Sequence, residues 1–238
     1  KQTNIYYWQA SQQVFREFGY FGNPWDLNIQ FKDEYLQQQF PENSGFKITY
    51  RFNIETQVPE SLYLVVERTD LYDTYCNGTR IDDEPHQWFI DRDFGQRDIS
   101  KLAQVGENEI VLEAHPLTVW HEMQPIYIIG NFSLKPAEKG FTIAPPTPLK
   151  LGSWKNQGYP LYGHGVTYTQ HITVENPKQK YLVTLPENGW YGSVALVRVN
   201  GEDAGVIYCR PYECDISKCI VAGENEIAVT VIATLKTT

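Results

Sequence analysis

Hydrophobic and polar residues alternate in short segments from residue 46 onward, the pattern of strands with one buried face. These segments are rich in β-branched and aromatic residues, and Asn-Gly turns at 77–78, 188–189 and 200–201 separate several of them. The pattern predicts strands at 46–55, 61–67, 108–114, 125–134, 166–175, 180–185, 193–201 and 225–235. A helix is predicted before them, at 11–18. We therefore expect an all-β protein, a sandwich or a barrel.

One sixteen-residue segment occurs twice in the sequence. Residues 98–113 read DISKLAQVGENEIVLE and residues 215–230 read DISKCIVAGENEIAVT, which match at nine positions without a gap. An Asn-Gly turn precedes each copy, at 77–78 and 200–201. The offset of 117 residues is far above the roughly 20–50 residues of solenoid repeats. The sequence therefore predicts a duplicated domain.

The repeated segment is interpreted as a structural turn followed by a strand. In the first copy, Asp98 is placed to cap the backbone N–H groups of a tight turn, and Ile99 is placed to enter the core beneath it. Gly106 tolerates a positive φ at the bend that follows. The glutamates of the segment share one strand face, roughly 6–7 Å apart. Because nothing marks one of them as a buried acid, we predict no catalytic residue here.

A proline-rich stretch at 135–152 divides the chain. Its four prolines disfavour ladder pairing and suit an extended connector. The predicted domains are residues 1–140, with a leader segment at 1–45, and residues 141–238.

Composition excludes several classes of function. The net charge is −9 and Lys and Arg are not clustered, which argues against a nucleic-acid surface. No apolar run approaches the roughly 18–20 residues of a membrane helix, and the start lacks a signal-peptide pattern. Cys209, Cys214 and Cys219 follow a C-x4-C-x4-C spacing that does not fit a zinc site. A Cys209–Cys214 disulfide and ordinary half-buried strand cysteines remain as alternatives.

The second half of the chain resembles the galactose-binding-like jelly roll, in particular the sugar-binding β-sandwich of family 2 glycoside hydrolases. The segments that carry this resemblance are residues 151–174, 194–205, 209–217 and 222–235. Residues 121–134, running into GSWKNQGYP, are similar to the C-terminal region of α-L-rhamnosidase-like glycosidases. In those enzymes tandem sandwiches follow a catalytic barrel. The resemblance covers roughly residues 46–238 and implies two tandem jelly-roll β-sandwiches.

The resemblance also implies a role. The chain of 238 residues, without a βαβ pattern, has no room for a (β/α)8 barrel, which needs about 250 residues. We expect a non-catalytic accessory region of a larger, extracellular or periplasmic glycoside hydrolase. Its partners would be a glycan and the catalytic domain of the same polypeptide, with no nucleic acid and no membrane span. A purely structural or protein-interaction module and a stand-alone glycosidase are the alternatives.

No cofactor is expected, although such folds often hold a structural calcium ion through loop carboxylates. The carboxylates in suitable loops are Asp70, Asp73, Asp82, Asp83 and Glu84. Their alternative role is that of solvated loop acids.

Sugar sites combine a flat aromatic ring with planar polar groups that bind hydroxyl pairs. Three clusters offer these ingredients: the loop with His86, Trp88, Asp91, Arg92 and Asp93; the segment with His115, Trp120, His121 and Glu122; and two loops with Trp190, Tyr191, Arg210 and Tyr212. The predicted ligand-binding residues are Trp88, His115, Trp120, His121, Trp190, Tyr191 and Arg210. The structural alternative is that the aromatic residues pack over a core edge, and that Arg210 forms an ion pair. For the pair His115 and His121, a metal site lacks a third ligand.

Overall fold

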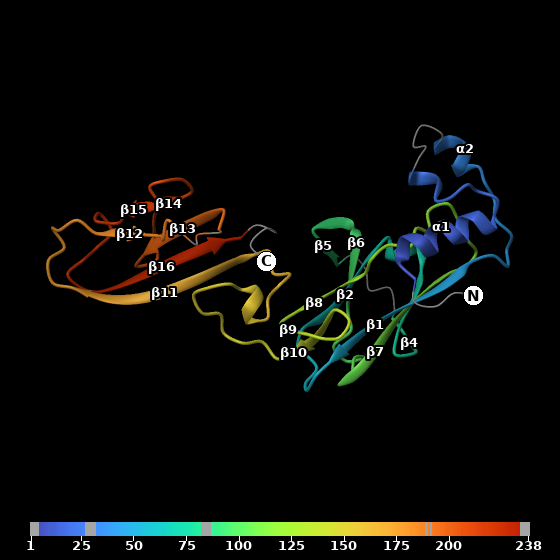
Figure 1. Cartoon of the computed structure of the whole chain (residues 1–238), viewed down its shortest axis with the longest axis horizontal. Coiled ribbons are helices and arrows are strands. Elements are labelled where there is room, and N and C mark those ends of the chain that lie inside the picture. Colours follow the sequence, from blue (N-terminus) through green and yellow to red (C-terminus); the bar gives the residue numbers. More distant parts are fainter. Residues whose placement is uncertain (1–4, 27–31, 82–86, 189, 191, 234–238) are drawn as a thin grey trace. The chain divides into compact units, whose positions relative to one another are not determined.

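The computed structural model describes residues 5–26, 32–81, 87–188, 190 and 192–233 (Figure 1). The chain divides into two compact units, Lys1–Pro146 and Thr147–Thr238. The described part of the first unit begins with α1 (Tyr7–Glu17), the 3-10 turn η1 (Pro24–Asp26) and α2 (Lys32–Leu36). Every later element is a strand or a short 3-10 turn, so the chain is mostly β, as predicted.

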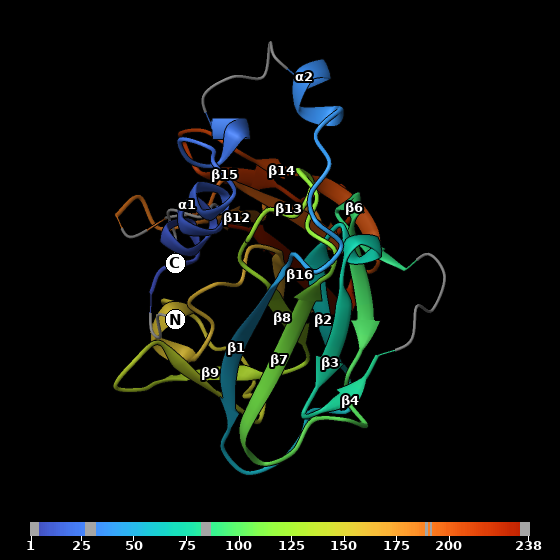
Figure 2. The same cartoon turned by 90° about the vertical axis from the view of Figure 1, so that its right-hand side faces the viewer.

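Two sheets form the body of the first unit. In spatial order, one sheet contains β4 (Thr79–Arg80), β3 (Asp73–Cys76), β7 (Gly106–Ala114), β1 (Phe46–Ile54), β10 (Phe141–Ala144) and β9 (Ser133–Pro136). The other contains β5 (Trp88–Phe89), β6 (Asp91–Asp98), β2 (Leu62–Glu67) and β8 (Tyr127–Gly130). Figure 2 shows β1, β7 and β3 side by side. The turn η3 (Thr69–Leu71) leads from the second sheet to the first.

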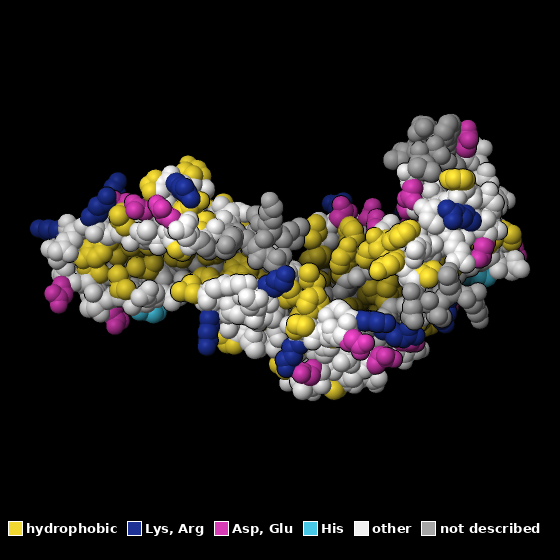
Figure 3. All heavy atoms as spheres, viewed as in Figure 1, with side chains coloured by type: hydrophobic (Ala, Val, Ile, Leu, Met, Phe, Trp, Pro, Cys, Tyr) yellow, Lys and Arg dark blue, Asp and Glu magenta, His cyan; other side chains and the backbone are white. Residues whose placement is uncertain are grey.

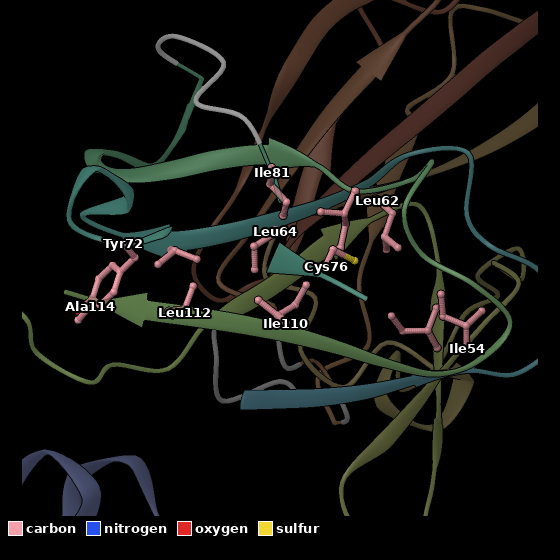
Figure 4. Close-up of a cluster of buried hydrophobic side chains, with 12 residues drawn as sticks. Ile54, Leu62, Leu64, Tyr72, Cys76, Ile81, Ile110, Leu112 and Ala114 are labelled. Atoms are coloured by element: carbon pink, nitrogen blue, oxygen red, sulfur yellow. The ribbon is translucent and has the colours of Figure 1, made fainter. Parts of the chain in front are cut away.

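The core of the first unit lies between these two sheets. Leu62 and Leu64 of β2 are fully buried, and they belong to the same cluster as Ile110 and Leu112 of β7. Figure 4 shows these side chains converging from the two strands. The alternation of apolar and polar residues along β2 and β7 therefore turns one face of each sheet inward.

The second unit also has two sheets. One contains, in order, β11 (Gly165–Val174), β16 (Gly223–Ile232), β13 (Val194–Val199) and β14 (Glu202–Ile207). The other contains β12 (Leu182–Thr184) and β15 (Glu213–Asp215), and the turn η4 (Lys155–Gln157) precedes β11. Ala195, Val197 and Ile207 of the larger sheet pack with Cys214 and Ile216. In Figure 3, hydrophobic side chains reach the visible surface of both units.

Several elements differ from the sequence prediction. The predicted strand at 125–134 is two strands, β8 and β9, and β6 was not predicted because five of its eight residues are charged. Strand β10 pairs with β1 and β9 of the first unit, although its residues follow the predicted boundary at 140. Helix α1 begins at Tyr7 rather than at residue 11.

The four cysteines are free thiols in this structure, so the disulfide considered from sequence is not formed. Cys76 is buried, and this burial raises the pKa of its thiol to about 11.

The repeated segment forms the same turn in both units. Asp98 Oδ1 accepts hydrogen bonds from the backbone N–H (2.8 Å) and the hydroxyl (2.6 Å) of Ser100. Asp215 Oδ1 accepts the same pair from Ser217, at 3.0 and 2.6 Å. These carboxylates cap a turn, as the sequence indicated, and neither is buried.

Replacing Asp98 or Asp215 with alanine is expected to lower the free energy of unfolding by about 0.5–2 kcal/mol, the usual cost of a lost cap. Chemical denaturation of the full chain measures the loss. Glycan affinity should stay nearly unchanged in both variants. A large loss of affinity at unchanged stability would show that the turn is a binding site.

An asparagine pair closes each repeat, and the sequence did not predict the hydrogen bonds between its two members. Asn108 is 1% exposed, and its Oδ1 accepts from Asn77 Nδ2 (2.8 Å) and from the backbone N–H of Gln104 (2.8 Å). Asn108 Nδ2 donates to the carbonyls of Gln104 (2.7 Å) and Gly106 (3.0 Å). Every polar group of the amide is therefore paired in the interior, as burial demands.

The second unit repeats this pair with Asn225 and Asn200. Asn225 is 1% exposed, accepts from Asn200 Nδ2 (2.9 Å) and Val221 N–H (2.9 Å), and donates to Val221 O (2.8 Å). Asn77 and Asn200 both have positive φ values, 50° and 53°, each before a glycine. The shared sequence thus produces a shared set of hydrogen bonds in each unit.

Candidate functional site

A polar cavity of about 460 Å³ lies in the first unit beside β5 and β6. Its lining comes from η3, β6, β5 and the residue before it: Thr69, Asp70, Gln87, Trp88, Arg92, Asp93, Gly95, Gln96 and Arg97. We call it the Trp88 cavity. Its size falls within the range of small-ligand sites.

Strand β6 contributes residues from both of its faces to the cavity lining. Its Gly95 and Arg97 pair with Val66 and Leu64 of β2, whose side chains belong to the core. Directly paired residues point to the same face of a sheet, so Gly95 and Arg97 occupy positions where a core strand carries apolar side chains. At these inward positions β6 has a glycine and an arginine where the usual strand pattern has apolar residues, and both line the cavity.

Trp88 lies opposite a glycine, which leaves its ring accessible. The register pairs Trp88 with Gly95, and Trp88 is 51% exposed. A Cβ at position 95 would lie 2.4 Å from Thr69 Oγ1, so the glycine allows η3 to approach β6 here. An exposed ring next to a hollow is the feature needed for stacking on a flat ligand.

The charged groups of the cavity are partly neutralised. Arg68 Nε and Nη2 donate to the two carboxylate oxygens of Asp70 (2.9 and 2.8 Å), and this pairing holds the pKa of Asp70 below its ordinary value. The backbone N–H of Arg68 also donates to Asp93 O (2.7 Å). Arg97 is 7% exposed, and its Nη1 lies 3.5 Å from Ile81 O. Arg92 is exposed at the same cavity.

Segment 115–124, the second predicted cluster, connects parts of the first unit. Trp120 stacks on Trp25 with ring centroids 5.2 Å apart, and Trp25 Nε1 donates to Val119 O (2.6 Å). Asn23 Nδ2 donates to Glu122 Oε2 (2.7 Å). Burial raises the pKa of Glu122, while the bond from Asn23 opposes that rise. The segment therefore fastens the N-terminal part of the unit.

His121 is buried at 4% exposure and uses both ring nitrogens. Its Nδ1 accepts from the backbone N–H of Thr118 (2.9 Å), so the proton of the neutral ring resides on Nε2, 2.7 Å from Leu71 O. Burial lowers the pKa of His121, because desolvation disfavours the imidazolium. This geometry favours a structural role over ligand contact.

Acidification below about pH 6.5 is expected to destabilise the first unit through His121. An unfolded histidine titrates near 6.5, and the native pKa is lower, so between the two values the unfolded chain binds more protons. The free energy of unfolding therefore falls as the pH drops from 6.5 towards the native pKa, and this contribution is complete above 6.5. Urea titrations across that range should show a steeper loss for the wild type than for His121→Asn. Equal slopes would contradict the assignment.

The remaining predicted residues are more dispersed. His115 is exposed, with Nδ1 3.0 Å from Ser44 O, beside a shallow hollow of about 390 Å³. In the second unit, half-buried Trp190 lies next to Tyr212 (ring centroids 6.4 Å apart), and the Arg210 guanidinium lies 6.0 Å from the Tyr212 ring centroid. The third cluster thus comes together, but Trp190 and Tyr212 also pack on the core.

Some predicted residues lie outside the described part of the chain: Asp82, Asp83, Glu84, His86 and Tyr191. Asp70 and Asp73 are ion-paired with Arg68 and Arg80. Within the described ranges, no group of three or more His, Cys, Asp or Glu residues could hold a metal ion. No helix within those ranges is long and apolar enough to cross a membrane.

Of the residues that line the cavity, the sequence singled out Trp88, Arg92 and Asp93 as sugar-site candidates and Asp70 as a calcium candidate. It did not single out Thr69, Gln87, Gly95, Gln96 and Arg97. The sequence of β6 contained a sign of the lining residues that this strand contributes. DRDFGQRD has the bounds of a strand but polar residues at alternate, core-side positions.

Comparison with known proteins gives remote likenesses. No protein-family model and no curated protein matches the chain. Among solved structures, it is similar to a rhamnosidase from Novosphingobium sp. PP1Y, with 16% identity, a TM-score of 0.33, and coverage of 83% of this chain and 19% of that one. For the α-L-rhamnosidase of Streptomyces avermitilis, complexed with L-rhamnose, the identity is 9%, the TM-score 0.32, and the coverage 81% and 22%.

A lectin from Pleurotus ostreatus is similar at 13% identity and a TM-score of 0.22, over 81% of this chain and 69% of the lectin. The chain spans less than a quarter of the length of the two rhamnosidases above.

Proposed function

We propose that this chain is a non-catalytic, carbohydrate-binding accessory region of a larger glycoside hydrolase, built from two jelly-roll-like β-sandwiches. The observation that carries the proposal is the Trp88 cavity. It combines a half-exposed indole with side chains that bind hydroxyl groups, namely Gln87, Gln96 and Arg92. Stacking on the ring and forked hydrogen bonds are the two interactions that a pyranose needs. The sequence resemblance to glycosidase sandwiches supports the parent enzyme.

The residues of the Trp88 cavity suit the binding of a sugar better than the hydrolysis of a glycosidic bond. Hydrolysis of a glycosidic bond needs one carboxyl group with a raised pKa as the general acid and a second carboxylate beside it. The pKa of Asp70 is held below its ordinary value by Arg68, which is the wrong direction for an acid. Glu122, whose pKa burial raises, is bonded to Asn23 and does not line the cavity.

A purely structural role is the second candidate, and the engagement of segment 115–124 favours it. Trp120 and His121 were predicted to contact ligand, yet they contact Trp25, Thr118 and Leu71. If the Trp88 cavity behaves in the same way, the chain would place or stabilise a neighbouring domain and bind no sugar.

Calorimetric titration of the full chain with plant, bacterial and animal oligosaccharides tests the proposal. We expect at least one glycan to bind with a dissociation constant in the micromolar to millimolar range, about −8 to −4 kcal/mol. Flat heats for all of them would favour the structural role. Release of aryl alcohol from aryl glycosides by this chain alone would establish a glycosidase instead.

A further inference from the structure

We propose that the Trp88 cavity selects a glycan bearing a carboxylate, a uronic acid residue, and that Arg92 is the residue that reads this charge. The inference rests on the proposed function and adds the class of sugar.

The two carboxylates of the cavity lining face one arginine outside it. Arg68 holds Asp70 through two hydrogen bonds of 2.9 and 2.8 Å, and its backbone N–H binds Asp93 O. The charge of Asp93 also acts on Arg68, whose pKa is raised chiefly by Asp70. Asp91 Oδ1 is occupied by the backbone N–H of Asp93 (2.9 Å). The Asp70 carboxylate is thus paired with Arg68, and the Asp91 carboxylate is bonded to the backbone of the same strand.

Arg92 differs from these carboxylates in its contacts. It lines the cavity and is exposed, and among the described residues none forms an ion pair or a hydrogen bond with its guanidinium. Most other described arginines have a partner: Arg51, Arg68, Arg80 and Arg198 all pair with carboxylates. Arg92 and the exposed indole of Trp88 belong to the same cavity lining, so in a protein of net charge −9 this cavity offers a ligand an exposed guanidinium.

The geometry of a guanidinium gives the selectivity its chemical basis. Its N–H groups form a planar fork that matches the two oxygens of a carboxylate, and such charge-assisted bonds are stronger than bonds to a hydroxyl. A pyranose stacked on Trp88 places the substituents of its ring edge towards the lining. A carboxylate at C5 of the ring therefore gains a partner in Arg92 that a hydroxymethyl group does not gain.

Paired probes test the inference. Oligomers of galacturonic, glucuronic and mannuronic acid are titrated beside the same oligomers after reduction of their carboxyl groups to primary alcohols. We expect the acidic form of at least one pair to bind about tenfold more tightly, and its affinity to fall with salt while that of the reduced form does not. Arg92→Ala should reduce the preference to less than about threefold, because the acidic form loses more affinity than the reduced form does. Arg92→Lys should retain part of the preference.

Arg51→Ala is the matched control, because it removes the same charge from an exposed position of the same unit, on β1, outside the cavity. It should keep the full preference. Equal binding of acidic and reduced oligomers, binding of neutral glycans alone, or a preference that survives Arg92→Ala would overturn the inference and leave the proposed function standing. Absence of binding to every glycan would overturn both.

Discussion

Replacing Asn108 with alanine is expected to lower the free energy of unfolding of the first unit by about 2–4 kcal/mol, because several buried polar groups lose their partners together. Asn108 is 1% exposed, and its amide satisfies Asn77 Nδ2, the N–H and carbonyl of Gln104, and the carbonyl of Gly106. Water cannot easily replace the amide at such a buried position. Each unsatisfied buried group costs about 1–3 kcal/mol, and partial relaxation keeps the sum below the upper limit.

Urea unfolding of the full chain, followed by hydrogen exchange to localise the change, measures this loss. Asn225→Ala is the matched variant, since it removes the corresponding amide of the second unit, and its effect should be similar and confined to residues 147–233. Asn53→Ala, at an exposed position of β1, serves as the control and should change stability by less than about 0.5 kcal/mol. If Asn108→Ala is as mild as Asn53→Ala, the asparagine pair does not stabilise the repeat.

The repeat shows what the sequence can predict. Asp98, Ile99 and Gly106 were assigned correctly to a cap, a core position and a positive φ of 94°, because each of these roles depends on local backbone chemistry. The role of Asn108 depends on Asn77, which lies 31 residues earlier in the chain. A local pattern cannot contain a hydrogen bond between residues so far apart, so the strongest constraint in the repeat became visible only in the structure.

Strand β6 shows a second limit of prediction from sequence, which concerns a strand without the usual apolar residues. The strand was not predicted because β-propensity and apolar alternation are signals of burial, and five of its eight residues are charged. Its core-side positions carry polar residues that line the cavity. The candidate site was found only through Trp88 and its charged neighbours. In segment 115–124 the same kind of residues predicted a ligand site, but His121 is a buried brace. Residue type alone did not distinguish an exposed ring beside a cavity from a buried structural histidine, whereas the exposure of the side chains does.

Trp88→Ala is expected to weaken glycan binding at least tenfold, which corresponds to about 1.4 kcal/mol or more. Tryptophan residues near the centre of a binding site are often those whose truncation costs about 2 kcal/mol or more, since a large rigid ring contributes contact area with little loss of entropy. Stability should change little, because the side chain is 51% exposed and stands opposite Gly95 rather than a packed neighbour. Trp88→Phe should recover part of the affinity by keeping a smaller stacking face.

Two comparisons make the Trp88 result specific to the cavity. Trp8→Ala removes an indole of similar exposure, 55%, from α1 and should leave affinity unchanged. Trp190→Ala tests the cluster with Tyr212 and Arg210 in the second unit. If affinity falls with Trp190→Ala and survives Trp88→Ala, the sugar site belongs to the second unit, where the sequence resemblance is stronger, and the polar face of β6 needs another explanation. If only Trp88→Ala weakens binding, the sugar site is the Trp88 cavity of the first unit, which β5 and the neighbouring polar strand β6 form together.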